Sequence, residues 1–383
     1  MATEYATEPR AVAEQAAMVA AAWSPPGAPP SWALTAAQFE ALRDDPELLA
    51  LAAAIAPDRL PPLLFEAAAT FLVLELEPHP LRSWFPTVGR PQPPLAPGFR
   101  AHYREFCLEH RDRLLALCER HRYQMNEVGR CAGVVPALAP ADGREIALID
   151  VGTGAGLALH LDRYRYVYEG ADGELTTVGD PGSPVLIETQ LRGPRPPPLP
   201  AGLPRIADRI GIDVEPIDIS DPAVRAWLAA CIPQEIGAVT RFHAAADVAT
   251  QNPARMVRGD ACAVLPEVLA AIPDGLLTCV TDSYVHVFFE PPQLERFREL
   301  IDEAGARRDL DWVSIDPLVP MGRAASRSVL GIPVPEALRE RNRREGVFGV
   351  IGRLSRRDGR RTGDLLGLAH PGAAWLEWLG PRG

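Results

Sequence analysis

The sequence contains no lysine, so all 39 of its Lys+Arg positions are arginines, and 50 acidic residues give a formal net charge of −11. Such a chain does not suit sequence-independent nucleic-acid binding, which depends on a basic surface. No apolar stretch reaches the roughly 18 residues that a membrane span needs. The strongest candidate, Leu60–Leu76, is interrupted by Pro61, Pro62 and Glu66. We therefore expect no nucleic-acid partner and no membrane partner.

Cysteine is sparse as well. The six cysteines include no CxxC pair and fall in segments with helix-like or strand-like patterns, at positions 107, 118, 131, 231, 262 and 279. This usage is typical of reduced, buried thiols, so we predict a cytoplasmic protein without a metal site. The first ten residues carry Glu4 and Glu8 but no basic region, so we expect no secretory signal.

The remaining composition is that of a large folded protein. The chain has 383 residues, of which 47% are hydrophobic, and this is ample material for a core despite 40 prolines and 31 glycines. Residues 1–139 carry apolar side chains at helical spacing, which predicts an α-helical N-terminal cap region. Beyond residue 140, short apolar runs alternate with helix-like segments, which predicts an α/β domain over 140–383.

Helix-capping and turn residues predict where the helices and hairpins of this α/β domain begin and end. Aspartate followed by proline, at Asp221-Pro222, predicts a helix start, as Asp45-Pro46 does in the helical region. Turn residues around 170–173 and 180–182 predict an inserted β-hairpin near 164–193, and Asp358-Gly359 predicts a C-terminal β-hairpin. The predicted strands of the sheet are 146–151, 210–219, 254–258, 276–281 and 310–315.

The strongest motif is Asp150-Val-Gly152-Thr-Gly154-Ala-Gly156, directly after the first predicted strand. Its glycines allow a tight turn and close approach of a ligand, and we expect the turn to open a helix with free N–H groups. A dinucleotide fingerprint needs a glycine at position 157, where this chain has leucine. The spacing instead resembles motif I of class I S-adenosylmethionine (SAM)-dependent methyltransferases. The plain alternative is a turn that only packs a helix on a strand.

In methyltransferases of this kind, the motif I acid faces the amino group of the cofactor's methionine moiety. Acidic residues also follow the later predicted strands, at the sheet edge where open α/β proteins bind ligands. The resemblance implies a ribose contact for Asp213 and an adenine contact for Asp260. Asp282 and Asp316 follow the next two strands. Each acid has the alternative of being a helix N-cap or a solvated loop residue.

A resemblance to a second family covers roughly residues 60–380. The chain resembles the actinobacterial DUF2332 family, which implies a methyltransferase-like Rossmann fold. The matching segments are 124–131, 150–164, 211–218, 257–260 and 370–379. After the fourth and fifth strands that family tends to have His-Ser and Ser-Asn-Glu, whereas this chain has Asp282-Ser283-Tyr284-Val285-His286 and Ser314-Ile315-Asp316. The difference lies at the expected substrate rim, so it favours a changed substrate or reaction.

A polar group precedes the apolar segment that leads into the sheet. Asn126, Glu127 and Arg130 need partners if they are buried, and a ligand can supply them; alternatively, Glu127 and Arg130 pair with each other on a helix surface. We assign the candidate site residues as follows: catalysis to Asp282, Asp316, His286 and Glu127; cofactor binding to Asp150, Gly152, Gly154, Gly156, Asp213 and Asp260; and substrate binding to Asn126, Arg130 and Tyr284. Isolated histidines such as His286 are also common in purely structural roles.

These assignments describe one cleft at the strand ends. So many carboxylates would repel one another, so at least one should have a raised pKa unless a cation lies among them. A SAM sulfonium or a protonated amine substrate would be such a cation.

Three functions fit the patterns. The leading hypothesis is a SAM-dependent methyltransferase acting on a small molecule in secondary metabolism. The second is an enzyme that keeps this fold but catalyses elimination or ring closure, for example on an amine with a sulfate or phosphate leaving group, free or bound to a carrier protein. The third is a non-catalytic partner subunit. The arginines of region 339–361 are either a solvated face or a docking surface for an acidic carrier or partner protein.

Overall fold

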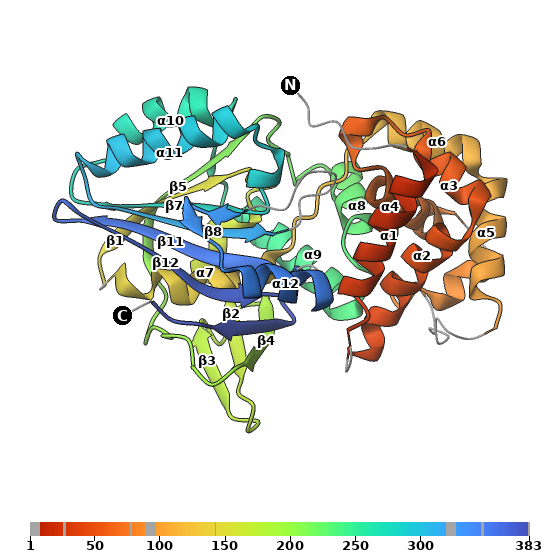
Figure 1. The fold of residues 1–383 in the computed structure, drawn as a ribbon, viewed down its shortest axis with the longest axis horizontal. Coiled ribbons are helices and arrows are strands. Elements are labelled where there is room, and N and C mark those ends of the chain that lie inside the picture. Colours follow the sequence, from red (N-terminus) through yellow and green to blue (C-terminus); the bar gives the residue numbers. More distant parts are fainter. Residues whose placement is uncertain are drawn as a thin grey trace.

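The N-terminal part of the chain is helical. The computed structural model describes residues 8–25, 28–76, 79–88, 97–141, 143–318, 327–345 and 348–381, so most of the segment considered above for a secretory signal lies outside the described part. The α-helices of residues 9–120 are grouped on the right of Figure 1: α1 (Pro9–Ala22), α2 (Ala33–Asp44), α3 (Pro46–Ala53), α4 (Pro61–Glu75), α5 (Phe99–Glu109) and α6 (Arg111–Arg120).

Helix α4 connects this helical part to the rest of the molecule. Its residues are apolar on nearly every side, and Leu64 and Phe65 are fully buried, as expected of a helix that is hydrophobic all round. Phe71 of α4 packs against Trp227 of α8 (Pro222–Ala230), with ring centroids 5.7 Å apart. Within the described residues, no helix is both long enough and apolar enough to cross a membrane.

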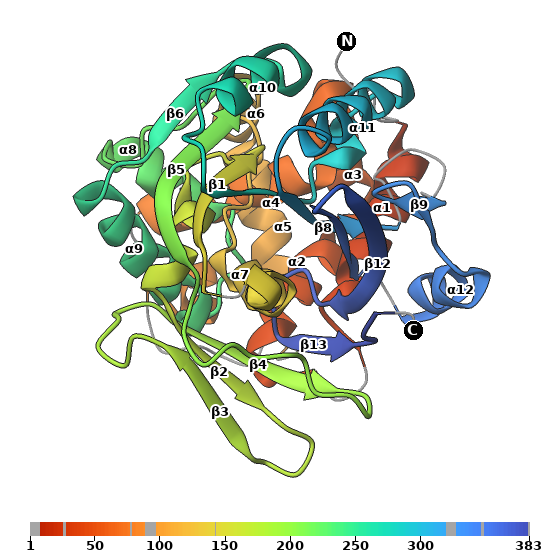
Figure 2. The same ribbon diagram turned by 90° about the vertical axis from the view of Figure 1, so that its left-hand side faces the viewer.

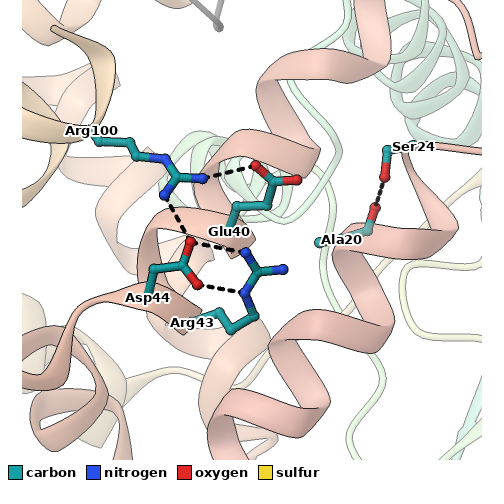
Figure 3. Close-up of polar contacts among 6 residues, drawn as sticks. All are labelled: Ala20, Ser24, Glu40, Arg43, Asp44 and Arg100. Atoms are coloured by element: carbon teal, nitrogen blue, oxygen red, sulfur yellow. Dashed lines mark hydrogen bonds and ion pairs between the residues drawn. The ribbon is translucent and has the colours of Figure 1, made fainter.

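Surface arginines add links between these helices. Arg100 of α5 donates to Asp44 and Glu40 of α2, at 2.7 and 3.1 Å, and Arg43 donates two further hydrogen bonds to Asp44 (Figure 3). Arg100 is exposed and Arg43 is partly exposed, and ion pairs at such places contribute about 0–1 kcal/mol each. The buried apolar faces therefore supply most of the stability of this part.

The second part is built on one large sheet, as the strand pattern predicts. The described strands of this sheet are β1 (Glu145–Val151), β2 (Arg165–Glu169), β3 (Leu175–Gly179), β4 (Leu186–Arg192), β5 (Arg205–Asp213), β6 (Arg255–Arg258), β7 (Leu277–Ser283), β8 (Leu310–Pro317), β11 (Gly349–Arg357), β12 (Arg360–Ala369) and β13 (Trp375–Trp378). Their order is β3-β2-β4-β13-β12-β11-β8-β7-β1-β5-β6. The five strands from β8 to β6 are all parallel. The prediction of an α/β fold is confirmed at this level.

Helices cover both faces of the parallel strands. On one face lie α10 (Ala261–Ala270) and α11 (Pro291–Gly305); on the other lie α7 (Cys131–Leu138), α8 and α9 (Ile236–Gln251). Figure 2 shows the sheet curving around α7, which is buried along its whole length. Strands distant in the sheet reach this helix, because Tyr168 of β2 donates to the Ala132 carbonyl and Arg353 of β11 to the Ala137 carbonyl.

Both predicted hairpins are present. Strands β2 and β3 are antiparallel around the turn at 170–173, and β11 and β12 are antiparallel around Asp358 and Gly359, which both have positive φ angles. A short helix, α12 (Glu336–Glu345), and a two-stranded ladder of β9 (Ser328–Val329) and β10 (Ile332–Pro333) precede the C-terminal hairpin.

The glycine turn does not open an α-helix, contrary to the prediction. A short 3₁₀ helix, Leu157–Arg163, follows it, with His160 in a non-helical conformation. Buried hydroxyls take the carbonyls that an α-helix would use: Tyr164 donates to Leu157 O and Tyr166 to Leu161 O, both at 2.6 Å. Strands β2 to β4 follow, so no crossover α-helix connects β1 with its parallel neighbour β5.

The helix start predicted at Asp221-Pro222 offers a test of local stability. Asp221 Oδ1 accepts a hydrogen bond from Ala223 N at 2.8 Å, at the first turn of α8. We expect Asp221→Ala to lower the free energy of unfolding by about 1 kcal/mol, because this N–H loses its acceptor. Asp221→Asn keeps an oxygen acceptor and should stay near wild type in urea unfolding. Equal losses in both variants would contradict the capping role.

Candidate functional site

A small cavity of about 80 Å³ lies at the carboxyl end of β1. From β1 the chain builds β5 and β6 on one side and then crosses to β7 and β8 on the other. Open α/β sheets bind ligands at such a switch point. The polar lining residues are Asn126, Glu127, Arg130, Asp150, Thr153, Thr281 and Ser283, and the apolar ones include Met125, Val134, Leu157 and Leu161. The structure thus brings together Asn126, Glu127, Arg130, Asp150 and Gly152 from the predicted site.

Asp150 is a buried carboxyl group of this cavity whose pKa is raised. Only 7% of it is exposed, and its Oδ1 accepts a hydrogen bond from Thr281 Oγ1 at 2.8 Å. Burial raises the pKa of Asp150 from the usual 3.8 to about 7; the Thr281 hydroxyl opposes the rise, and the carboxylates of Asp282 and Asp213 add to it. A carboxyl group with such a pKa can take up or release a proton near neutral pH.

The glycine turn beside Asp150 is covered by the chain itself. Gly152, Gly154 and Gly156 have φ angles of 67°, 56° and 72°, which glycine adopts without a steric penalty. A Cβ atom on Gly154 would lie 2.7 Å from Asn126 Oδ1, and one on Gly152 would lie 2.5 Å from a methyl group of Val285. Side chains therefore occupy the space directly above the turn.

The N–H groups of the turn also have protein acceptors. Gly154 N donates to Asp213 Oδ2 at 2.9 Å, and Ala155 N donates to Asn126 Oδ1 at 3.0 Å. The other oxygen of Asp213 accepts from Glu215 N. Asp213 and Asn126 thus hold the turn in place, so neither N–H needs a ligand to be satisfied.

Glu127 and Arg130 do not pair with each other. Glu127 Oε1 accepts from Gly129 N at 2.7 Å and from the Arg241 guanidinium of α9 at 3.0 Å, so its charge is compensated. Arg130 lies over the Tyr284 ring, 4.2 Å from its centroid, and its Nε donates to the Pro371 carbonyl. Tyr284 adopts φ 63°, which is strained for a bulky residue and occurs preferentially at functional sites.

Asp282, Asp316 and His286 form a separate cluster. Side chains alternate across a strand, so Asp282 points to the opposite face of β7 from Thr281. His286 Nε2 lies 3.3 Å from Asp282 Oδ1, and Nδ1 lies 3.2 Å from Asp316 Oδ2. Asp282 also accepts from Trp312 Nε1 and Ser314 Oγ, both at 2.6 Å. These three residues, which the sequence assigns to catalysis, lie outside the cavity lining.

In this second cluster, the imidazole and the two carboxyl groups affect one another's ionisation. Burial alone would lower the pKa of His286, but the carboxylates of Asp282 and Asp316 raise it to about 10. Burial raises the pKa of Asp316, and the hydrogen bond and charge of His286 oppose that rise. The cluster is therefore a buried cation held between two carboxyl groups.

Asp260 lies at a third place. It is exposed, accepts from Ala263 N at 3.1 Å as the N-cap of α10, and accepts from Gln293 Nε2 at 2.5 Å. The residues predicted to line one cleft therefore lie in three places. Asp150 is in the cavity, Asp282 and Asp316 are in the buried cluster with His286, and Asp260 caps α10. Within the described residues, no group of three or more His, Cys, Asp or Glu side chains is arranged to hold a metal ion.

The arginines near the C-terminus are paired with the protein's own acids. Arg341 binds Glu377 through two hydrogen bonds, at 3.0 and 2.7 Å, and Arg357 binds Asp311 at 2.6 Å. Further ion pairs of this region join Arg339 and Arg343 to Glu336, Arg344 to Glu345, Arg353 to Asp311, and Arg356 and Arg361 to Asp302. These arginines therefore have carboxylate partners within the protein, and a docking role for the region stays a prediction.

The family model described as "Uncharacterized protein conserved in bacteria (DUF2332)" matches residues 14–378. The chain belongs to the DUF2332 family. Among curated proteins, none matches the chain significantly. The family assignment covers the helical part and the sheet alike, and it assigns no reaction to either.

Sequence reasoning missed several residues of the DUF2332 cavity, chiefly Thr281, Thr153 and Ser283. A signal for two of them is present in β7. Parallel pairing sets Asp150 beside Thr281, and Thr281 and Ser283 lie two residues apart, on one face of the strand. Asp282 has the more reactive side chain, but it occupies the other face.

Proposed function

We propose that this protein is an enzyme that binds a small amine-bearing substrate in the cavity and exchanges a proton with it through Asp150. The observation that carries the proposal is one buried carboxyl group, with a pKa of about 7, in a cavity at the switch point of the sheet. A positioned acid–base group of this kind contributes about 10²–10⁴-fold to a reaction rate. An ammonium group is also the natural partner of a buried carboxylate.

Ring closure of the amine is the reaction type we propose. The nitrogen lone pair forms a C–N bond within the substrate, and the bond from that carbon to a sulfate or phosphate group breaks. The leaving group takes the electron pair and is released as an anion, and the N–H proton passes to Asp150. The sequence offers Asp282 and Asp316 for this role, but their side chains lie in the buried cluster with His286. Asp150 therefore takes the role, since it lines the cavity.

Methyl transfer is the second candidate. The parallel order β8-β7-β1-β5-β6 and the three-glycine turn support a methyltransferase-like Rossmann relationship for the sheet. The residues above the turn do not fit SAM, however. Asn126 and Val285 occupy the space over the glycines, Asp260 caps α10, and a cavity of about 80 Å³ is several times smaller than the cofactor. An actinobacterial, cytoplasmic role in secondary metabolism is part of either proposal.

Ligand titrations separate the two candidates. We expect propylamine to bind the wild type in saturation-transfer NMR, more tightly at pH 8 than at pH 6, because an ionised Asp150 attracts the ammonium group. Asp150→Asn should abolish this binding. SAM should give no calorimetric signal with the wild type. SAM binding together with no amine binding would overturn the amine proposal in favour of methyl transfer.

A variant of Asn126, whose side chain lies above Gly154, extends the same titration experiment. Asn126→Ala removes the side chain above Gly154, while Asp213 still accepts from Gly154 N. If SAM bound this variant and not the wild type, Asn126 would be a closing element of a methyltransferase site. Absence of SAM binding in both proteins supports the amine proposal. Gln124→Ala is a second variant of the same kind, because Gln124 Oε1 lies 3.4 Å from the same Cβ position.

A further inference from the structure

The cavity contains a cation as well as a carboxyl group. Arg130 lines it, and among the described residues no carboxylate forms an ion pair with this guanidinium. Its contacts are the Tyr284 ring, the Pro371 carbonyl and, from Nη2, the thioether sulfur of Met125 at 3.1 Å. A thioether is a weak acceptor, so a carboxylate can replace it at little cost. Arginine in turn is the side chain best suited to hold a carboxylate through two parallel hydrogen bonds.

The second acid of the cavity does not supply that carboxylate. Glu127 is only 3% exposed in its side chain and is compensated by Arg241. Asp150 is tied to Thr281 on the β7 side of the cavity. Arg130 is therefore a lining residue without a carboxylate partner, and its Nη2 contacts Met125, which also lines the cavity, whereas Asp150 supplies a carboxyl group.

Volume limits the ligand. A cavity needs about 10–15 Å³ to hold one water molecule. The cavity of about 80 Å³ therefore accommodates on the order of five to eight groups of the size of a water molecule. The apolar lining of Val134, Leu157 and Leu161 suits a short aliphatic side chain. The ligand is then small, with a positive group, a negative group and an apolar portion.

We propose that the substrate of this site is a small free α-amino acid, with its carboxylate on Arg130 and its ammonium group on Asp150. This inference rests on the proposed function, which places an amine at Asp150. It goes further by requiring a free carboxylate. A substrate attached to a carrier protein through that carboxyl group lacks the charge that Arg130 recognises.

Four probes that share an isopropyl group test the inference by NMR or calorimetric titration. L-valine carries both charges, its methyl ester and isobutylamine carry only the amine, and isovalerate carries only the carboxylate. We expect L-valine to bind at least about tenfold more tightly than each of the other three. Arg130→Gln should remove this preference, and isobutylamine should still bind.

Two further variants keep the test decisive. Arg130→Lys keeps the charge but loses the paired hydrogen bonds, so it should give an intermediate preference, and it serves if the glutamine variant does not fold. Arg225→Gln, on the surface of α8 and paired with Asp247, is the matched control and should behave as wild type.

Two outcomes separate this inference from the proposed function. If the ester and the amine bind as tightly as L-valine, or if Arg130→Gln leaves valine affinity unchanged, the amino-acid inference is wrong while the amine proposal stands. If neither L-valine nor isobutylamine binds the wild type, the proposed function itself fails.

Discussion

Replacing His286 with glutamine is expected to lower the free energy of unfolding by about 3–5 kcal/mol at pH 7. The imidazole lies between Asp282 and Asp316, within 3.3 Å of both, and all three residues are almost completely buried. Glutamine keeps a similar volume and hydrogen-bonding capacity but carries no charge. The two carboxyl groups would then face each other in a dry environment without a cation, which accounts for the size of the loss.

The effect should depend on pH with a definite sign. The pKa of His286 is raised in the folded protein, from 6.5 to about 10. The stabilisation is therefore complete below pH 6.5, and it is lost as the pH rises through 10, since only the folded state holds the proton between these values. Urea unfolding from pH 6 to 10 should show a steeper loss of stability in the wild type than in His286→Gln.

A surface histidine provides the control for this series. His243 of α9 is exposed, and His243→Gln should change the unfolding free energy by less than about 0.5 kcal/mol. A His286→Gln protein within 1 kcal/mol of wild type, with an unchanged pH slope, would mean that no buried ion-pair cluster exists at this place.

The sequence predicts the sheet well because buried parallel strands leave a strong local signal. Continuous apolar runs such as 146–151 and 310–315 need no tertiary information to be recognised, and the structure places β1 and β8 there. Helix α12 shows the opposite case. Seven of its ten residues are charged, so no apolar stripe marks it, and the sequence analysis does not predict it. Strand β13 is too short for alternation to be visible.

The conformation after the glycine turn could not be predicted for a different reason. Residues 157–163 have the composition of a helix, but Tyr164 and Tyr166 take the carbonyls of Leu157 and Leu161. These hydroxyls come from the following segment, so the sequence of residues 157–163 alone does not reveal them. Tertiary hydrogen bonds therefore decide between an α-helix and a 3₁₀ helix there.

The sequence does not reveal which face of the sheet each candidate site residue occupies, and this limited the prediction of the site. Residue type alone directs attention to the carboxylates at 282 and 316, yet the register of β7 and β8 turns both toward α10 and α11. Sequence and structure agree on Asp150. The glycine motif and the end of β1 predict a site there, and Asp150 lines the cavity. Which of the acids titrates near neutral pH depends on burial, and burial is a property of the whole fold.

Replacing Asp150 with asparagine is expected to make the protein more stable, by an amount that grows as the pH rises from about 4 to about 7. The pKa of Asp150 is raised on folding, from 3.8 to about 7, so ionisation above pH 7 costs the folded state roughly 4 kcal/mol. Asparagine avoids this cost and can still accept from the Thr281 hydroxyl. The gain should grow from under about 2 kcal/mol at pH 5 to roughly 4 kcal/mol at pH 8.

The direction of this change separates a functional carboxylate from a structural one. Asp162 pairs with Arg209 through two hydrogen bonds of 2.6 Å, so Asp162→Asn should lower stability over the same pH range. Chemical denaturation of both variants at pH 5 and 8, together with propylamine titration, makes the comparison. If Asp150→Asn lost stability at pH 8, the carboxylate would be a structural element of β1. A gain in stability combined with loss of amine binding is the result expected where a protein keeps an unfavourable buried charge for its chemistry.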